Sequence, residues 1–211
     1  GIPPTISSYF SQINTGVKLT LKNKRLLALL LVGLVTIASS YVFDTNITTP
    51  LQLNLGIDIA LFGVIQSLIA IGYFVVNYFS YKIADKFGDV ASLSFSLITS
   101  TLFLFILSKT NYLYGAGFIV LFFMTHGFRC NVLNNLQQKE ATSAQRSTIA
   151  SAGNVIKSLG TAAMLPLWGG LIDISGVNTT LIALGLFMLV FGLGGTWAYS
   201  RLKATSSFQA A

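Results

Sequence analysis

Four polar side chains that could bind an anion or a polar group lie within long apolar stretches of this chain. His126 and Arg129 are three residues apart, which makes them neighbours on one face of a helix. Asn154 and Lys157 have the same spacing in a later apolar stretch. The polar side of that helix also includes Ser151, Ser158 and Thr161. Amide, imidazole, guanidinium and ammonium groups all donate hydrogen bonds, so this pattern indicates a binding site rather than a catalytic one.

Two further side chains, Gln66 and Tyr73, lie in another apolar stretch and can donate hydrogen bonds at different depths. For His126 and Arg129 a structural role stays open, because both can hydrogen-bond to neighbouring helices. Arg129 can also extend toward lipid headgroups. For Lys157 the cost is decisive: an ionised side chain at bilayer depth costs at least about 2.5 kcal/mol, so it normally faces a water-filled cavity or a partner.

Catalytic chemistry is not predicted for this chain. All six acidic residues lie at or beyond the ends of apolar stretches, which leaves no carboxylate pair at mid-depth. They are Asp44, Asp58, Asp85, Asp89, Glu140 and Asp173. No nucleophile with a base, no metal-ligand cluster and no phosphate-binding glycine loop is recognisable. We therefore expect no metal site, no cofactor and no enzyme activity.

The elements that must hold these residues are six apolar stretches, each long enough to cross a bilayer. About 20 apolar residues make one helical crossing of the 30 Å hydrocarbon core. Only 9% of the residues are charged, against about 25% in a soluble domain. The sequence therefore predicts an all-α, polytopic membrane helix bundle. The expected spans are approximately Leu26–Phe43, Ile59–Tyr81, Val90–Leu107, Tyr112–Leu136, Thr148–Ile172 and Thr180–Tyr199.

The positive charges predict the orientation of these spans. If the first span starts in the cytoplasm, ten Lys and Arg residues fall on the inside and only Lys109 falls outside. Both termini are then cytoplasmic. The net charge of +7 marks topology rather than a nucleic-acid partner, because the cations lie at the ends of apolar segments. Sequons at Asn46 and Asn178 fall in predicted outer connections, where they could be glycosylated.

The chain divides into three parts by composition. Residues 1–25 are predicted to be a cytoplasmic linker with an amphipathic helix at the membrane surface, because apolar residues recur there every three or four positions. These residues are Ile6, Phe10, Ile13, Val17 and Leu21. Residues 26–203 are the predicted transmembrane domain, and 204–211 a cytoplasmic tail. The chain begins with Gly rather than Met, which we interpret as a fragment or a processed chain.

A motif occupies the expected cytoplasmic connection of about eight residues between the second and third spans. It reads Tyr81-Lys-Ile-Ala-Asp-Lys-Phe-Gly88. It resembles the G-x-L-A-D-R-x-G-R signature of the major facilitator superfamily, which Asp85, Lys86 and Gly88 match in position or type. Tyr81 replaces the first Gly, and Asp89 replaces the final basic residue. The resemblance implies a gating loop of Asp85, Lys86 and Gly88, in which the Asp85 carboxylate caps a helix or pairs with a cation.

Segments near residues 55–72 and 146–173 are similar to the eighth and eleventh helices of the same family. The resemblance covers almost all 211 residues, but only the second six-helix half of a twelve-helix transporter. It implies six helices arranged as two three-helix inverted repeats. It also implies an N-terminal six-helix half as a partner, besides the lipid bilayer and a small-molecule solute.

The function implied by the resemblance is secondary transport by alternating access, with solute export or exchange across the cell's inner or plasma membrane. Lys157, Asn154, His126 and Arg129 are the expected contributors from this half. Interior cations favour an anionic or zwitterionic solute. Replacing Lys157 or Arg129 by Ala is expected to impair transport and to leave expression intact. Two alternatives stay open: a complete six-span homodimeric carrier or channel, and an integral membrane enzyme acting on a lipid-linked phosphate.

Overall fold

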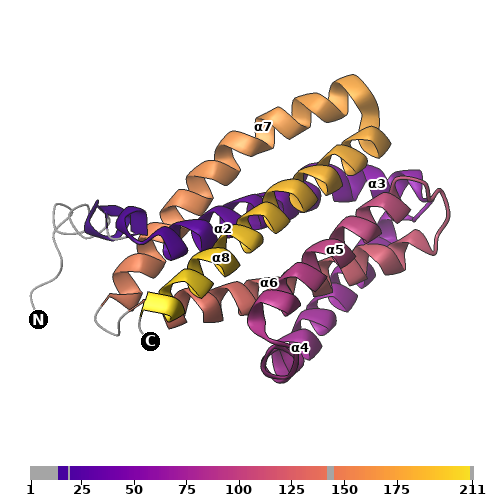
Figure 1. The fold of residues 1–211 in the computed structure, drawn as a ribbon. Coiled ribbons are helices and arrows are strands. Elements are labelled where there is room, and N and C mark those ends of the chain that lie inside the picture. Colours follow the sequence, from indigo (N-terminus) through magenta and orange to yellow (C-terminus); the bar gives the residue numbers. More distant parts are fainter. Residues whose placement is uncertain (1–13, 19, 142–144, 210–211) are drawn as a thin grey trace, which may run out of the picture.

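The computed structural model describes residues 14–18, 20–141 and 145–209, and every regular element in these ranges is a helix (Figure 1). Five stretches of the described residues are long and apolar enough to cross a membrane. These stretches are Lys24–Asn54, Ile59–Phe87, Asp89–Leu107, Gly115–Glu140 and Arg146–Leu202. The predicted all-α bundle of membrane-spanning helices is therefore confirmed.

The first stretch is a continuous helix that runs past the predicted end of the first span. It consists of α2 (Lys24–Val42), a π-helical turn η1 (Phe43–Ile47) and α3 (Thr48–Asn54). The hydroxyl of Thr48 donates to the carbonyl of Phe43 at 2.8 Å, across the wide turn. The predicted end at Phe43 is wrong, because the helix accommodates the polar residues that follow in a π-turn instead of stopping.

Asn46 lies in this π-turn rather than in a connection between spans. Its side-chain nitrogen donates to the carbonyl of Leu165 on α7, at 2.9 Å. The expectation that Asn46 lies in an outer connection is therefore wrong, because the residue belongs to a helical turn that packs against α7. The second sequon asparagine, Asn178, is exposed.

The motif between the second and third spans is helical. A short 3₁₀ turn η2 (Ile59–Leu61) leads into α4 (Phe62–Phe87), and α5 (Asp89–Leu107) follows. Only Gly88 separates the two helices, with φ +85°, a conformation that glycine adopts without strain. The predicted connection of eight residues is wrong, because Asp85 and Lys86 belong to the last turn of α4.

The C-terminal part of the chain turns back on itself. After α6 (Gly115–Glu140), α7 (Arg146–Phe187) contains one non-helical residue, Gly176, with φ 77° and ψ 167°. A second π-turn η3 (Met188–Gly192) and α8 (Leu193–Gln209) complete the chain. Figure 1 shows α7 reversing near its end and the chain returning along the bundle through α8. The stretch of 57 residues is nearly three times the length of one crossing.

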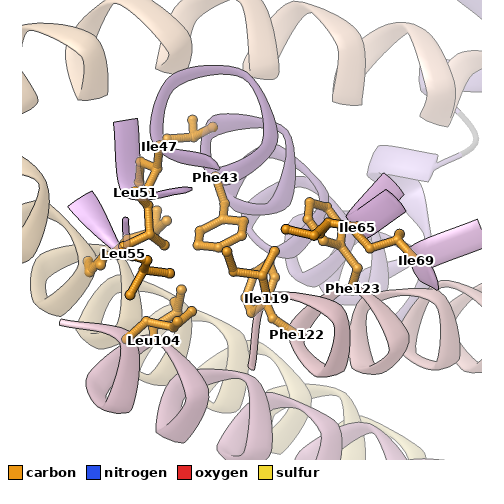
Figure 2. Close-up of a cluster of buried hydrophobic side chains, with 14 of the residues drawn as sticks. Phe43, Ile47, Leu51, Leu55, Ile65, Ile69, Leu104, Ile119, Phe122 and Phe123 are labelled. Atoms are coloured by element: carbon orange, nitrogen blue, oxygen red, sulfur yellow. The ribbon is translucent and has the colours of Figure 1, made fainter. Parts of the chain in front are cut away.

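The largest buried apolar cluster joins the π-turn to α4, α5 and α6 (Figure 2). The rings of Phe43 and Phe122 lie with their centroids 4.3 Å apart, and Phe123 packs edge-on against both. Leu104 and Ile119 are fully buried beside them. Because lipid is as apolar as leucine, close van der Waals packing, more than exclusion from water, stabilises such a core.

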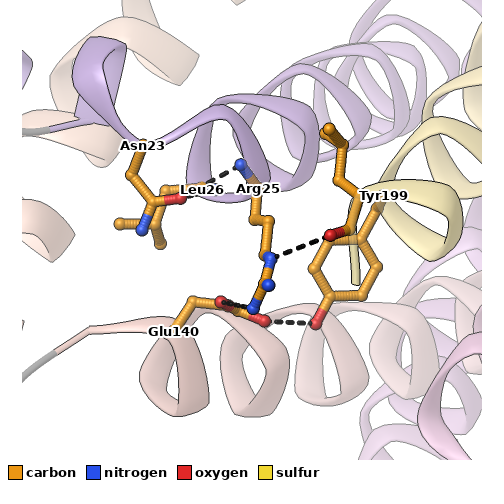
Figure 3. A network of polar contacts seen from close by, with 6 residues as sticks. Asn23, Arg25, Leu26, Glu140 and Tyr199 are labelled. Atoms are coloured by element: carbon orange, nitrogen blue, oxygen red, sulfur yellow. Dashed lines mark hydrogen bonds and ion pairs between the residues drawn. The ribbon is translucent and has the colours of Figure 1, made fainter. Parts of the chain in front are cut away.

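A polar network joins three helices at the end of the bundle where α2 begins (Figure 3). Arg25 forms an ion pair with Glu140 of α6, with Nη1 and Oε2 3.4 Å apart. Its Nε donates to the carbonyl of Leu202 on α8 at 3.3 Å. The hydroxyl of Tyr199 donates to the other Glu140 oxygen at 2.8 Å. This network joins the middle of α8 to α2 and α6.

A short helical segment precedes α2, over residues 14–18 and 20–22. Three of the apolar residues predicted for an amphipathic helix, Ile6, Phe10 and Ile13, lie outside the described residues. Leu21 is 58% exposed. Gly16 makes the contact with α7: a Cβ at this position would lie 2.6 Å from the backbone oxygen of Thr148.

Candidate functional site

An open cavity of about 650 Å³ lies between α2, α6 and α7. It brings together three of the predicted binding residues, His126, Asn154 and Lys157. The lining residues are Ile37 and Tyr41 of α2, His126 and Cys130 of α6, and Asn154, Lys157, Ser158, Thr161, Ala162 and Leu165 of α7. None of these residues is acidic, so Lys157 carries the formal charge of this cavity wall.

Lys157 projects from the polar side of α7. Its Cδ lies 3.6 Å from the position of a Cβ at Gly33, so the aliphatic part of the side chain runs close to α2. Among the described residues, the ammonium group has neither a hydrogen bond nor a carboxylate within ion-pair distance. Thr161, one turn later, donates its hydroxyl to the Lys157 carbonyl at 2.8 Å. The cavity therefore contains a cation whose counter-charge has to come from elsewhere.

His126 lines the cavity from α6, and Arg129 of the same helix holds its ring in place. An Nη2 nitrogen of Arg129 lies 3.5 Å from its Nδ1. A guanidinium group can only donate, so Nδ1 accepts this bond and the proton of a neutral ring is assigned to Nε2. Nε2 lies 3.6 Å from the sulfur of Cys130, which also lines the cavity. His126 thus presents a hydrogen-bond donor on the side that Cys130 shares.

Arg129 does not line the cavity, contrary to the expectation from its spacing with His126. Its side chain is fully buried among α2, α5 and α6. It donates to the hydroxyl of Ser100 at 2.7 Å and to that of Ser40 at 3.3 Å. The three-residue spacing predicts that Arg129 and His126 share one face of α6, but the helix packing directs the arginine to the hydroxyls of α2 and α5. Its role in this structure is to connect three helices behind the cavity wall.

A smaller cavity of about 160 Å³ adjoins the first one. Its lining residues are Ser40, Tyr41, Asp44, Tyr73, Phe123 and His126. Tyr73, a predicted site residue, therefore lies here and not in the larger cavity. Asp44 was missed, because the first span was predicted to end one residue before it. The signal was its spacing: Asp44 follows Tyr41 by three residues and so shares its helix face.

The remaining predicted residues lie away from both cavities. Gln66 is exposed on α4 and lines neither cavity. Asp85 is exposed and forms no hydrogen bond or ion pair with a described residue. The ammonium group of Lys86 lies 5.5 Å from the ring centre of Phe87.

The carboxylate that pairs at the α4–α5 junction is Asp89. Its Oδ2 lies 2.6 Å from the ammonium group of Lys139 on α6, and its Oδ1 accepts from the side chain of Asn135 at 3.1 Å. Asp89 also stands in the first turn of α5, where a negative charge is favoured by the helix dipole. The acidic residue at the position that departs from the motif thus makes the contact expected of Asp85.

Comparison with known proteins agrees with this arrangement. The family model described as Major Facilitator Superfamily matches residues 29–211. No curated protein and no solved structure matches the chain. The matched range covers all five apolar stretches except the first residues of α2, and it includes both cavities. The chain therefore belongs to the major facilitator superfamily, a family of membrane transporters.

Proposed function

We propose that this chain is one half of a secondary transporter that moves a small solute by alternating access. The observation that carries the proposal is Lys157, a cation without a described partner in an open polar cavity between three membrane helices. A buried or half-buried charge is costly in a membrane unless it faces water or a ligand. A passage that binds a solute would expose Lys157 to water when it is empty and to the solute when it is occupied.

The cavity chemistry supports an anionic or zwitterionic solute. Lys157 supplies the positive charge, and Asn154, Ser158 and His126 supply neutral hydrogen-bonding groups around it. Such a set matches an oxyanion such as a carboxylate, which accepts several hydrogen bonds at once. A volume of about 650 Å³ is within the range of pockets for small organic molecules.

We propose six crossings for the complete fold, with the fifth apolar stretch divided at Gly176 into two antiparallel helices. An N-terminal six-helix half would then cover the open side of the cavity and complete the passage. α4 supports this partner, since it leaves a broad apolar flank exposed. That flank includes Val64, Leu68, Ile71, Phe74 and Tyr78. The proposed orientation has both termini in the cytoplasm, in the inner or plasma membrane, with export or exchange as the direction.

Cys130 offers a test that needs no knowledge of the solute. It is the single cysteine of the 211 residues and it lines the larger cavity. We expect the charged, membrane-impermeant reagent MTSES to modify Cys130 in native membranes. In vesicles of either orientation, modification from both sides would show that the cavity opens alternately.

A matched control places the cysteine on the outer surface of α5. Phe95 is 69% exposed on α5. We expect this position to face lipid, so Phe95→Cys in a Cys130→Ser background should resist the charged reagent. If Cys130 reacts from neither side of the membrane, but does react after unfolding in detergent, the transport proposal fails.

A further inference from the structure

Asp44 is an acidic residue in the interior part of the first apolar stretch. It is residue 21 of the 31 residues of Lys24–Asn54 and lies in the π-turn. At a rise of about 1.5 Å per residue, it stands about 30 Å along a helix of about 46 Å. Side chains of a helix tilt toward its N-terminus, and the exposed Asp44 side chain follows this direction along the stretch. It lines the smaller cavity there.

The π-turn is held at both sides of Asp44. The Thr48 hydroxyl bonds to the Phe43 carbonyl within the turn, and Asn46 bonds to the Leu165 carbonyl of α7. The Asp44 carboxylate itself forms no hydrogen bond or ion pair with a described residue. π-turns occur often at functional sites, where they present a side chain that a regular helix would turn away.

The two cavities share a wall. Tyr41 and His126 line both of them, so the cavity beside Lys157 and the cavity beside Asp44 adjoin at these two side chains. One cavity therefore has a cation without a described partner, and the adjoining cavity has a carboxylate without one. Arg129 lines neither cavity, because its guanidinium is fully buried behind them and bonded to Ser40, Ser100 and His126.

We propose that the two adjoining cavities together bind a zwitterion, with its anionic group at Lys157 and its ammonium group at Asp44. This inference rests on the proposed transport function and names the substrate class of the same site. The rings of Tyr41 and Tyr73 flank Asp44 in the smaller cavity, and aromatic rings beside a carboxylate suit a cation. A solute with one charge would leave one of the two cavities unmatched, which disfavours simple anions and simple amines.

Ligand-induced stabilisation of the purified full-length protein tests the proposal. The probes are glycine, 4-aminobutanoate and 6-aminohexanoate, with butanoate and butylamine as analogues that carry one charge each. We expect at least one amino acid of this series to raise the unfolding midpoint. Butanoate and butylamine should bind at least about tenfold more weakly, because each lacks one charge-assisted contact.

Two variants separate the ends of the site. Lys157→Gln should weaken both the amino acid and butanoate by at least about tenfold, whereas Asp44→Asn should weaken the amino acid and leave butanoate unchanged. Asp58→Asn is the matched control: Asp58 lies outside both cavities and caps η2, a role that Asn retains.

The proposal is overturned if butanoate binds as tightly as the amino acids, if no amino acid of the series binds, or if Asp44→Asn behaves as wild type. The Cys130 labelling experiment tests the transport function separately. If Cys130 reacts from both sides of the membrane and any of these binding results is obtained, transport remains supported and only the zwitterion proposal fails.

Discussion

The ring of Tyr73 lies directly against the backbone of Gly127, where a Cβ would stand 2.4 Å from the ring carbon Cδ1. Glycine at this position of α6 lets α4 approach closely. The same ring lies 6.5 Å, centre to centre, from that of the adjacent His126, in an edge-on arrangement. Gly127 therefore sets the spacing of two side chains that line the smaller cavity.

Gly127→Ala should displace the Tyr73 ring and lower the thermal unfolding midpoint of the purified protein, since overpacking costs about 1–3 kcal/mol. Gly117→Ala is the control on the same helix, because nothing lies within 4 Å of a Cβ at that position. Alanine is also the better helix former, so this variant should match or exceed wild type. Equal midpoints for the two variants would contradict the close contact.

Arg129→Ala should reduce the yield of folded protein. The sequence alone predicts intact expression for this variant, but the buried position of Arg129 changes that prediction. The change removes a fully buried side chain and leaves its hydrogen-bond partners Ser40 and Ser100 beside a void. Removal of such a residue costs about 2–5 kcal/mol. Lys157→Ala should fold normally, since the Lys157 ammonium has no described partner. Size-exclusion chromatography with unfolding midpoints measures both, and a wild-type profile for Arg129→Ala would refute the structural role.

Asp89→Asn should destabilise the protein by about 1 kcal/mol, through the ion pair with Lys139 and the favourable position at the start of α5. High salt should reduce the difference, because the Lys139 side chain is half exposed. Asp85→Asn, four residues earlier in the last turn of α4, should stay within about 0.5 kcal/mol of wild type. Denaturation in mild detergent compares the two. A larger effect at Asp85 would restore it as the pairing carboxylate.

Glu140→Gln should loosen the end of the bundle that Figure 3 shows, because the ion pair with Arg25 is lost while the Tyr199 hydroxyl can still donate. Hydrogen exchange of backbone amides near the ends of α2 and α8 should accelerate, by up to about tenfold. Tyr199→Phe removes one bond and keeps the ion pair, so its effect should be smaller. Unchanged exchange in Glu140→Gln would mean that packing alone holds these ends.

The helices were predictable because each is a long run of apolar residues, and most of the cations lie at the ends of these runs. Their ends were not. The polar run after Phe43 resembles a connection, yet it forms a π-turn whose hydroxyl and amide groups bond within the bundle. Likewise, the motif at Asp85 reads as a loop by family resemblance, although only Gly88 leaves the helical conformation. Local polarity alone does not distinguish a helix with internal partners from a loop.

The candidate site was predictable where one helix supplied it. The spacing of Asn154 and Lys157 along α7 was enough to place both at one cavity. Residues on different helices required the packing itself: Arg129 turns inward to Ser100, and Asp44 of η1 lines one cavity with Tyr73 of α4. Such pairings depend on how helices rotate against one another, which a single sequence does not state.

The π-turn also determines the angular phase of everything beyond it on the same helix. Each residue advances the helix by about 100°, and the wider turn accommodates one residue more than an α-helical turn would. Leu51 and Leu55, which follow the turn, lie in the buried apolar cluster (Figure 2). The extra residue in the turn therefore determines which side chains of the following helical segment point into that cluster.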